Sequence, residues 1–224
     1  MKVSIVVPAL DEAGAITATL AALQPLRVQG HEVVVVDGGS RDTTLLIAKL
    51  LADRALAAPP GRASQMNAGA RHTDGDVLLF LHADTLLPPG AVAAMRAAID
   101  RGAAWGRFDV AFRGHAAILK VVAFMMNLRS RLTGIATGDQ AMFVTRAAFE
   151  RVGGFPPIAL MEDIALSAAL KRHAGMPACL RQKVETSGRR FDTHGPWRTI
   201  FRMWRLRAAY ALGADPAHLA RQYR

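Results

Sequence analysis

The stretch Val77-Leu78-Leu79-Phe80-Leu81-His82-Ala83-Asp84 decides the fold, because an apolar run ends there in a histidine and a carboxylate. No polar residue alternates within Val77 to Leu81, which is typical of a strand buried on both faces of a parallel sheet. Open α/β sheets bind ligands at the carboxyl ends of such strands. Asp84 therefore marks a candidate ligand site, where we expect a divalent metal ion on a nucleotide diphosphate.

The rest of the chain alternates between apolar strands and helical segments. Strands are expected at 2–9, 32–36, 54–58, 77–81, 103–112 and 141–145. Helices are expected at 13–23, 43–51, 62–69, 91–99, 116–132 and 162–173, with a turn-rich passage at 149–157. This alternation predicts the α/β class and a Rossmann-like, mostly parallel sheet flanked by helices. We expect one domain over 1–224.

Composition narrows the class of protein. The 224 residues are 51% hydrophobic, enough for one sizeable core. The single cysteine, Cys179, excludes an internal disulfide framework and a cysteine-rich zinc site, and favours the cytosol. The first apolar run ends at Leu10, too early for a secretory signal, and Lys120 interrupts the longest later run, so no membrane crossing is expected.

Positive charge gathers near the C-terminus. The formal net charge is +10, and residues 181–224 carry ten Lys or Arg against three Asp or Glu. This imbalance predicts an anionic partner: a phosphate-bearing substrate, an acidic membrane surface or nucleic acid.

Three acidic strand ends, at Asp11-Glu12, Asp37 and Asp84, should meet at one edge of the sheet. The alternative is that each carboxylate only caps the following helix. Neither G-x-G-x-x-G nor G-x-x-x-x-G-K-[ST] occurs, so hydride transfer and P-loop hydrolysis lose support. Without a P-loop, a metal ion is the natural way to neutralise a departing diphosphate.

The motifs resemble family 2 glycosyltransferases in their order and spacing over residues 2–190. The similar segments are Val3 to Glu12, Asp37-Gly38-Gly39-Ser40-Arg41-Asp42, Gly61 to Gly69, His82-Ala83-Asp84, Gly138-Asp139-Gln140 and Met161-Glu162-Asp163. The short chain also looks like a bacterial subgroup from radical-SAM gene neighbourhoods, some of whose members are linked to arsenosugar synthesis.

The resemblance implies a GT-A-type fold and a hexosyltransferase that uses a nucleotide-sugar donor, Mn²⁺ or Mg²⁺, and inversion at the anomeric carbon. The acceptor would be a small molecule or a lipid-linked one. Residues 1–100 would form the nucleotide-binding half, 101–194 the acceptor-binding half and 195–224 a basic helical segment.

The resemblance also assigns roles to single residues. Those expected at the nucleotide are Pro8, Leu10, Glu12, Asp37, Gly39, Arg62, Gln65 and Asn67. Asp84 would ligate the metal. His82 stands where the family has a first aspartate, so it is expected either as a second ligand or as a residue that positions one.

The acceptor side of the resemblance carries the catalytic prediction. Gly138, Asp139 and Gln140 would face the acceptor, and Asp163 would be the general base, with Glu162 as the alternative. From the residues alone, an acidic first turn of a helix is the favoured explanation of this pair, and the resemblance turns the preference toward catalysis. Arg189 and Arg190 are expected on a diphosphate or an anionic acceptor, or else in a solvated basic turn.

The segment 197–208 predicts a basic amphipathic helix. Its stripe is Trp197, Ile200, Phe201, Trp204 and Ala208. The stripe either packs on the domain or attaches a cytosolic enzyme peripherally to the inner face of an anionic membrane. Two other functions are weighed: nucleotidyl transfer on a related sheet, and nucleic-acid binding, which is disfavoured because aromatic residues make up only 6% of the chain.

Overall fold

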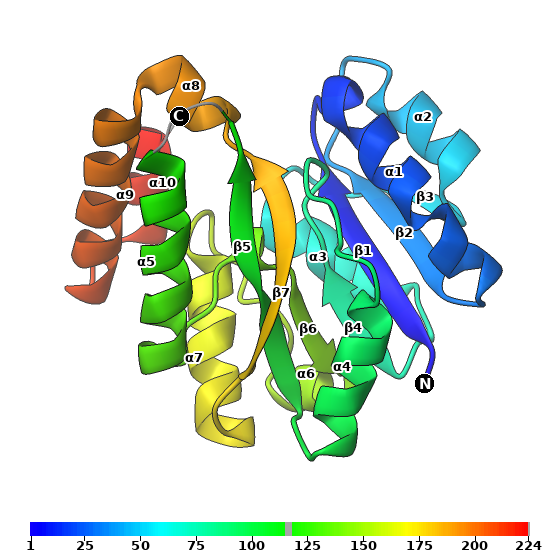
Figure 1. The fold of residues 1–224 in the computed structure, drawn as a ribbon. Helices are drawn as coiled ribbons and strands as arrows, with labels where there is room; N and C mark the ends of the chain where they lie inside the picture. The colour runs from blue at the N-terminus through cyan, green and yellow to red at the C-terminus, as the bar shows by residue number, and fades with distance from the viewer. Residues whose placement is uncertain (115–117, 224) are drawn as a thin grey trace.

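A mixed seven-stranded sheet forms the centre of the computed structural model, which describes residues 1–114 and 118–223 (Figure 1). The strands are β1 (Val3–Ala9), β2 (Glu32–Asp37), β3 (Arg54–Ala57), β4 (Val77–Phe80), β5 (Trp105–Arg113), β6 (Met142–Thr145) and β7 (Ala178–Ser187). Their order is β3-β2-β1-β4-β6-β5-β7. Only β6 runs antiparallel to its neighbours, so the sheet is mostly parallel, as predicted.

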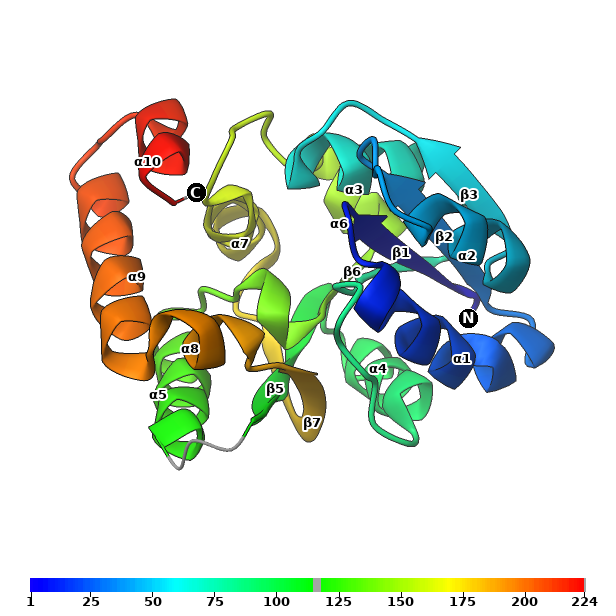
Figure 2. The ribbon, with the colours of Figure 1, turned by 90° about the horizontal axis from the view of Figure 1, so that it is seen from above.

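Helices cover both faces of the sheet. They are α1 (Ala13–Val28), α2 (Thr44–Leu51), α3 (Arg62–Arg71), α4 (Ala91–Asp100), α5 (Ile118–Thr133), α6 (Arg146–Arg151), α7 (Glu162–Ala174), α8 (Arg189–His194), α9 (Pro196–Ala211) and α10 (Pro216–Tyr223), with a 3₁₀ turn η1 (Gly138–Gln140). Helices α1, α2, α4 and α5 pack on one face, and α3, α6 and α7 pack on the other (Figure 2).

Strand β4 lies inside these two layers. Leu79 joins the apolar cluster on the face of α1 and α4, whereas Leu78 and Phe80 join the cluster on the face of α3. All four residues of the strand are buried. The apolar run is therefore explained by burial on both faces, as predicted.

Four local predictions needed correction. The predicted helix at 13–23 continues through Pro25 to Val28. The start of the passage expected to be turns, 149–157, belongs to α6, whose first turn is capped by the Thr145 hydroxyl. The passage at 189–190 is the helix α8. Strand β7 was not predicted, because it is an edge strand in which only three of ten residues are buried and apolar residues do not alternate. The predicted helix at 116–132 is α5, although 116 and 117 lie outside the described residues.

The C-terminal helix α9 does not pack the stripe that the sequence suggests. Trp197, Phe201 and Trp204 are exposed, and Leu206 on the opposite side of the helix is buried. The interpretation in which the aromatic stripe packs on the domain is therefore wrong. No helix in the described part of the chain is long and apolar enough to cross a bilayer.

Candidate active site

The loops that follow β1 and β2 are tied together by hydrogen bonds. The amide of Arg41 donates to Asp11 Oδ1 (2.7 Å), and the amide of Glu12 donates to Thr44 Oγ1 (2.8 Å). Asp11 adopts a left-handed backbone (φ 53°). Two of the three predicted acidic strand ends therefore share one fixed pair of loops.

Asp37 fixes the loop after β2 through hydrogen bonds to the loop's own backbone. Its Oδ2 accepts the amides of Gly39 and Ser40, each at 3.0 Å, and the side chain is buried. Gly39 has φ +95°, which side chains rarely tolerate. Asp37 and Gly39 thus fix the loop on which a nucleoside is expected.

Gln65 and Asn67, also predicted at the nucleotide, hold backbone around it. Gln65 Nε2 donates to the carbonyls of Ala9 (2.7 Å) and Val36 (2.8 Å), while the Asn67 amide group makes a reciprocal pair with the backbone of Phe155 (2.8 and 2.9 Å). The side-chain amide nitrogens of both residues therefore donate to backbone carbonyls of the protein. Of the remaining predicted residues, Pro8 is buried in β1, whereas Leu10 and Arg62 are exposed.

Asp84 follows β4 and lies beside two hydroxyl groups. The hydroxyls of Thr85 and Thr186 are each 3.4 Å from Asp84 Oδ1, and they are 2.9 Å from one another. Arg113 donates to the Asp84 carbonyl (2.7 Å). The carboxylate is partly exposed, so it can accept a ligand from the cleft.

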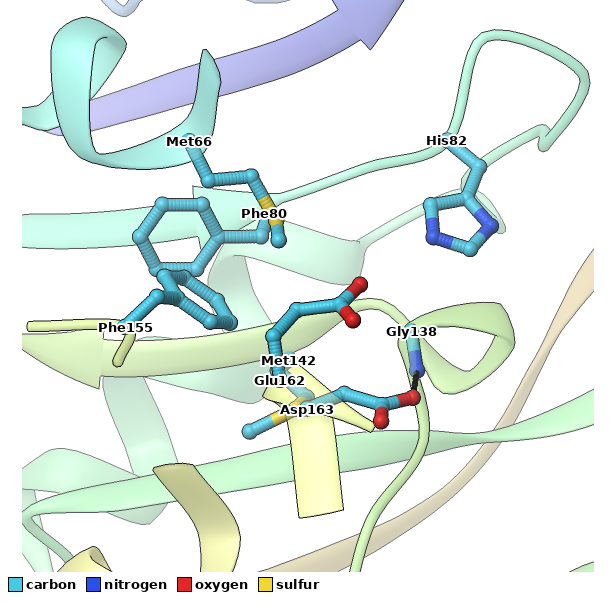
Figure 3. Close-up of a pocket in the computed structure, with 8 residues that line it drawn as sticks. All are labelled: Met66, Phe80, His82, Gly138, Met142, Phe155, Glu162 and Asp163. Carbon is cyan, nitrogen blue, oxygen red and sulfur yellow. Dashed lines mark hydrogen bonds between the residues drawn. The ribbon is translucent and has the colours of Figure 1, made fainter. Parts of the chain in front are cut away.

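The turn η1, whose residues are predicted to face the acceptor, contacts both the end of β4 and the start of α7. His82 Nδ1 lies 3.3 Å from Asp139 Oδ1. The amide of Gly138 donates to Asp163 Oδ2 (2.8 Å) (Figure 3). A Cβ at Gly138 would lie 2.4 Å from His82 Nε2. This packing favours a positioning role for His82 over direct ligation of a metal.

The third predicted residue of that loop, Gln140, points into the protein. It is fully buried, and its Nε2 donates to Ser130 Oγ (3.0 Å) and Asn127 Oδ1 (3.3 Å) of α5. Gln140 therefore supports the loop from beneath, and Gly138 and Asp139 form its cleft side.

Glu162 and Asp163 begin α7 beside a small pocket of about 10 Å³, enough for about one water molecule. Met66, Phe80, Met142 and Phe155 supply its apolar walls (Figure 3). Burial, reinforced by the charge of Asp163, raises the pKa of Glu162. Burial also raises the pKa of Asp163, although the amides of Gly138 and Ile164 oppose the change.

Asp139 behaves in the opposite way. Burial alone would raise the pKa of its carboxyl, but the hydrogen bond from His82 and the positive charges of Arg62 and Arg190 outweigh it and lower that pKa. The pKa of Asp139 is therefore shifted down, whereas the pKa values of the neighbouring Glu162 and Asp163 are shifted up. Such a separation of pKa values is common at catalytic sites.

The two C-terminal arginines lie on α8, with Arg190 close enough to Asp139 and Asp84 to feel their charges. Partial burial and the charge of Arg62 lower the pKa of Arg190, whereas Asp139 and Asp84 oppose that change. Arg189 Nη2 lies 3.2 Å from Glu12 Oε2. The structure thus brings Arg62, Asp84, Asp139 and both arginines to one edge of the sheet.

The residues present fit a metal ion only if the ion takes most of its ligands from substrate phosphates and water. Among the residues that the structure describes, no group of three or more His, Cys, Asp or Glu side chains is arranged to hold one. Mg²⁺ in such sites commonly takes one or two carboxylates and completes its shell with substrate phosphates and water. Asp84, beside two hydroxyls, fits that arrangement.

Sequence reasoning missed Thr186 and Arg113, which surround Asp84. Thr186 is 102 residues from Asp84 in the chain and lies on the unpredicted strand β7. No spacing or composition signal connects the two positions.

Comparisons with known proteins show the family and the fold of the chain. Residues 4–152 match the family described as glycosyl transferase family 2. The fold is similar to TarS 1–349 of S. aureus in complex with UDP-GlcNAc (TM-score 0.66, 20% identity, 84% of this chain and 58% of that one). It is also similar to glucosyl-3-phosphoglycerate synthase of Mycobacterium tuberculosis with Mn²⁺, UDP and glucosyl-3-phosphoglycerate (TM-score 0.61, 20% identity, 83% and 70%).

The match to uncomplexed TarS 1–349 has a TM-score of 0.67, and the chain covers 60% of that protein's length. A search of curated proteins finds no match. The family match covers well over half of the sequence and includes the two donor-side loops, α3 and Asp84. The chain therefore belongs to glycosyl transferase family 2.

Proposed function

We propose that this protein is a metal-dependent, inverting glycosyltransferase that moves a sugar from a nucleotide-sugar to an acceptor hydroxyl. The observation that carries the proposal is that the 138–139 loop contacts both the end of β4 and the start of α7. His82, two residues before Asp84, lies beside Asp139, and the amide of Gly138 donates to Asp163. Family membership disfavours nucleotidyl transfer and nucleic-acid binding. The acceptor class remains small or lipid-linked.

The two halves divide the task. Residues 1–100 carry the loops after β1 and β2, Arg62 and Asp84, and would hold the donor. Residues 101–194 carry Asp139, the Glu162–Asp163 pair and the two arginines of α8, and would hold the acceptor. Arg189 and Glu12 join the halves through their ion pair.

Asp84 would hold a Mn²⁺ or Mg²⁺ ion, which supplies charge neutralisation for the departing diphosphate. Arg62 and Arg190 place further positive charge in the same cleft. Asp163 takes the proton of the acceptor hydroxyl as that oxygen attacks the anomeric carbon from the side opposite the diphosphate. The bond from the sugar to the diphosphate breaks, and the configuration inverts.

Replacing the two carboxylates tests the division of roles. Asp84→Asn should abolish metal-dependent release of nucleoside diphosphate, and Asp163→Asn should lower sugar transfer on the order of 10²-fold or more while donor binding changes little. Product chromatography measures both, and pyrophosphate in place of nucleoside diphosphate would indicate nucleotidyl transfer. Wild-type transfer rates in both variants would show that the roles are wrongly assigned.

A further inference from the structure

Helix α9 presents a stripe of large aromatic side chains to solvent. Trp197, Phe201 and Trp204 are 73%, 72% and 66% exposed. They recur at i, i+4 and i+7, so they lie on one side of the helix. Burial of such side chains is ordinarily favourable, and a contiguous exposed stripe indicates a surface that meets a partner.

The opposite side of α9 accounts for its packing on the protein. Leu206 is fully buried in a cluster with Leu160, Met161 and Leu219. The helix is therefore docked by one side and free on the other. Core packing does not explain the aromatic stripe.

Helix α5 adds a second exposed apolar side at the same end of the molecule. It carries Val121, Phe124, Met125, Leu128 and Leu132. Both views show α5 and α9 beside α8 at the end remote from α1 and α2 (Figures 1 and 2). The buried side of α5 packs on β5 and the buried side of α9 packs on α10, so the exposed side chains lie on the opposite side of each helix. Together these helices hold eight of the fourteen large hydrophobic side chains found exposed among the described residues.

The same two helices carry only positive charge. Helix α9 contains Arg198, Arg202, Arg205 and Arg207, and α5 contains Lys120, Arg129 and Arg131. Neither helix contains an aspartate or a glutamate.

Four of these cations are paired within the protein or partly buried. Arg131 pairs with Asp109, and the terminal nitrogens of Arg129 are buried. Arg202 donates to the Gln222 carbonyl of α10, and burial lowers the pKa of Arg207. Lys120, Arg198 and Arg205 are exposed, and we call the exposed sides of α5 and α9, with these three cations, the aromatic–basic face.

We propose that the aromatic–basic face docks on an anionic lipid bilayer. Tryptophan beside arginine suits the boundary between headgroups and acyl chains, and basic side chains add attraction to acidic lipids. A second copy of the chain fits less well, because a twofold contact would set this positive face against itself. Nucleic acid also fits less well, because four of the five exposed apolar side chains of α5 are not aromatic and offer no stacking surface.

Docking would bring the candidate active site to the membrane surface. Helix α8 precedes α9 directly and carries Arg190 into the cleft. Phe191 of α8 packs edge-on against Phe112 of β5, with ring centroids 5.2 Å apart, so α8 is fixed to the sheet. The proposal does not depend on the transferase activity, because it rests on the surface alone.

Tryptophan fluorescence tests the proposal on the intact protein. Of the three tryptophans, Trp105 is fully buried, so a change on adding vesicles reports Trp197 and Trp204. We expect a blue shift with phosphatidylcholine vesicles that contain phosphatidylglycerol. In about 0.5 M salt the shift should be smaller, because salt screens the attraction between the basic side chains and the acidic lipids. Equal binding to neutral vesicles, or none to either, would overturn the proposal.

Variants locate the face. The triple change Trp197→Ser, Phe201→Ser and Trp204→Ser should reduce vesicle co-sedimentation by roughly 100-fold or more. Arg198→Gln with Arg205→Gln should reduce it by roughly 30-fold, at about fivefold for each arginine. Phe124→Ser with Leu128→Ser tests α5, and unchanged co-sedimentation would exclude that helix from the face.

Matched controls separate docking from folding and from self-association. Leu46→Ser with Leu50→Ser removes exposed apolar side chains from α2 and should leave vesicle binding unchanged. Circular dichroism and thermal melting check that every variant folds. A blue shift that grows with protein concentration without vesicles, together with a dimer in sedimentation velocity, would assign the face to a second copy and contradict the proposal.

Discussion

Glu162 is the residue at which two electrostatic effects compete. The start of a helix favours a negative charge by about 0.3–1 kcal/mol, which is why acidic first turns are ordinary. Here burial against Phe80, Phe155 and two methionines, with Asp163 adjacent, has the larger effect and raises the pKa of Glu162. The helix start alone therefore does not explain the pair, whereas a proton-accepting role does.

Changing Glu162 to Gln tests this competition through activity. Removing its charge should lower the pKa of Asp163, because one negative neighbour is lost. The acidic limb of the kcat/KM profile should therefore move to lower pH in the variant, with transfer retained. A profile of nucleoside diphosphate release from pH 4 to 8 measures it. Loss of transfer at every pH would instead indicate that Glu162 is the base. The acidic limb of the kcat/KM profile of Asp163→Asn would then decide between the two carboxylates.

The same change should stabilise the fold at neutral pH. A buried carboxyl with a raised pKa destabilises the folded state fully above its folded-state pKa, and it ceases to do so below its unfolded-state pKa. We expect Glu162→Gln to raise the free energy of unfolding by roughly 1 kcal/mol at pH 7 and to lose that gain near pH 4. Urea titrations at both pH values check the sign. Glu150→Gln, on exposed α6, is the control and should change little at either pH.

At the scale of elements, the site depends on contacts between the ends of β4, η1 and α7. A strand end and a helix start carry local signals, and these drew attention to Asp84 and to the Glu162–Asp163 pair. Their roles come from the family resemblance and stay predictions. The role of Gln140 was not predictable, since its burial against Asn127 and Ser130 depends on how α5 docks. The same holds for Thr186 on β7, an edge strand without apolar alternation.

The contact of Gly138 with His82 gives a prediction at this scale. Gly138→Ala would place a methyl group 2.4 Å from His82 Nε2, so the ring or the loop must move. We expect a loss of about 1–3 kcal/mol in stability and a fall in kcat larger than the change in donor KM. Thermal melting and steady-state kinetics measure the two.

The double variant shows whether the imidazole ring is the cause. His82→Ala removes the atoms that the methyl group meets, so Gly138→Ala should cost little in that background. Equal costs in the wild-type and His82→Ala backgrounds would contradict the contact. Gly114→Ala is a less suitable control because it meets Leu119, whereas Gly14→Ala, on α1 with open space around it, is the matched one.

For the molecule as a whole, the sequence predicted the α/β class and the mostly parallel sheet most fully. Periodicity and strand-end chemistry are local, and they fixed β1, β2 and β4 with their carboxylates. The outward orientation of α9 could not be predicted, because an amphipathic stripe is compatible with packing on the domain or with exposure. Only the docking of Leu206 on the opposite side decides between them.

Donor binding should stabilise the whole fold, because the cleft joins residues from both halves. A ligand at 100 times its Kd adds about 2.7 kcal/mol, which corresponds to a Tm rise of roughly 5–10 °C for a domain of this size. We expect such a rise with a UDP-sugar and Mn²⁺ or Mg²⁺, because two proteins of similar fold are described with UDP or a UDP-sugar. Asp84→Asn should lose the metal-dependent part of the rise, and Asp163→Asn should keep it. If the donor raised the Tm of Asp84→Asn as much as that of the wild type, both with and without EDTA, Asp84 would not hold the metal. Donor binding would then depend on the loops around Asp37.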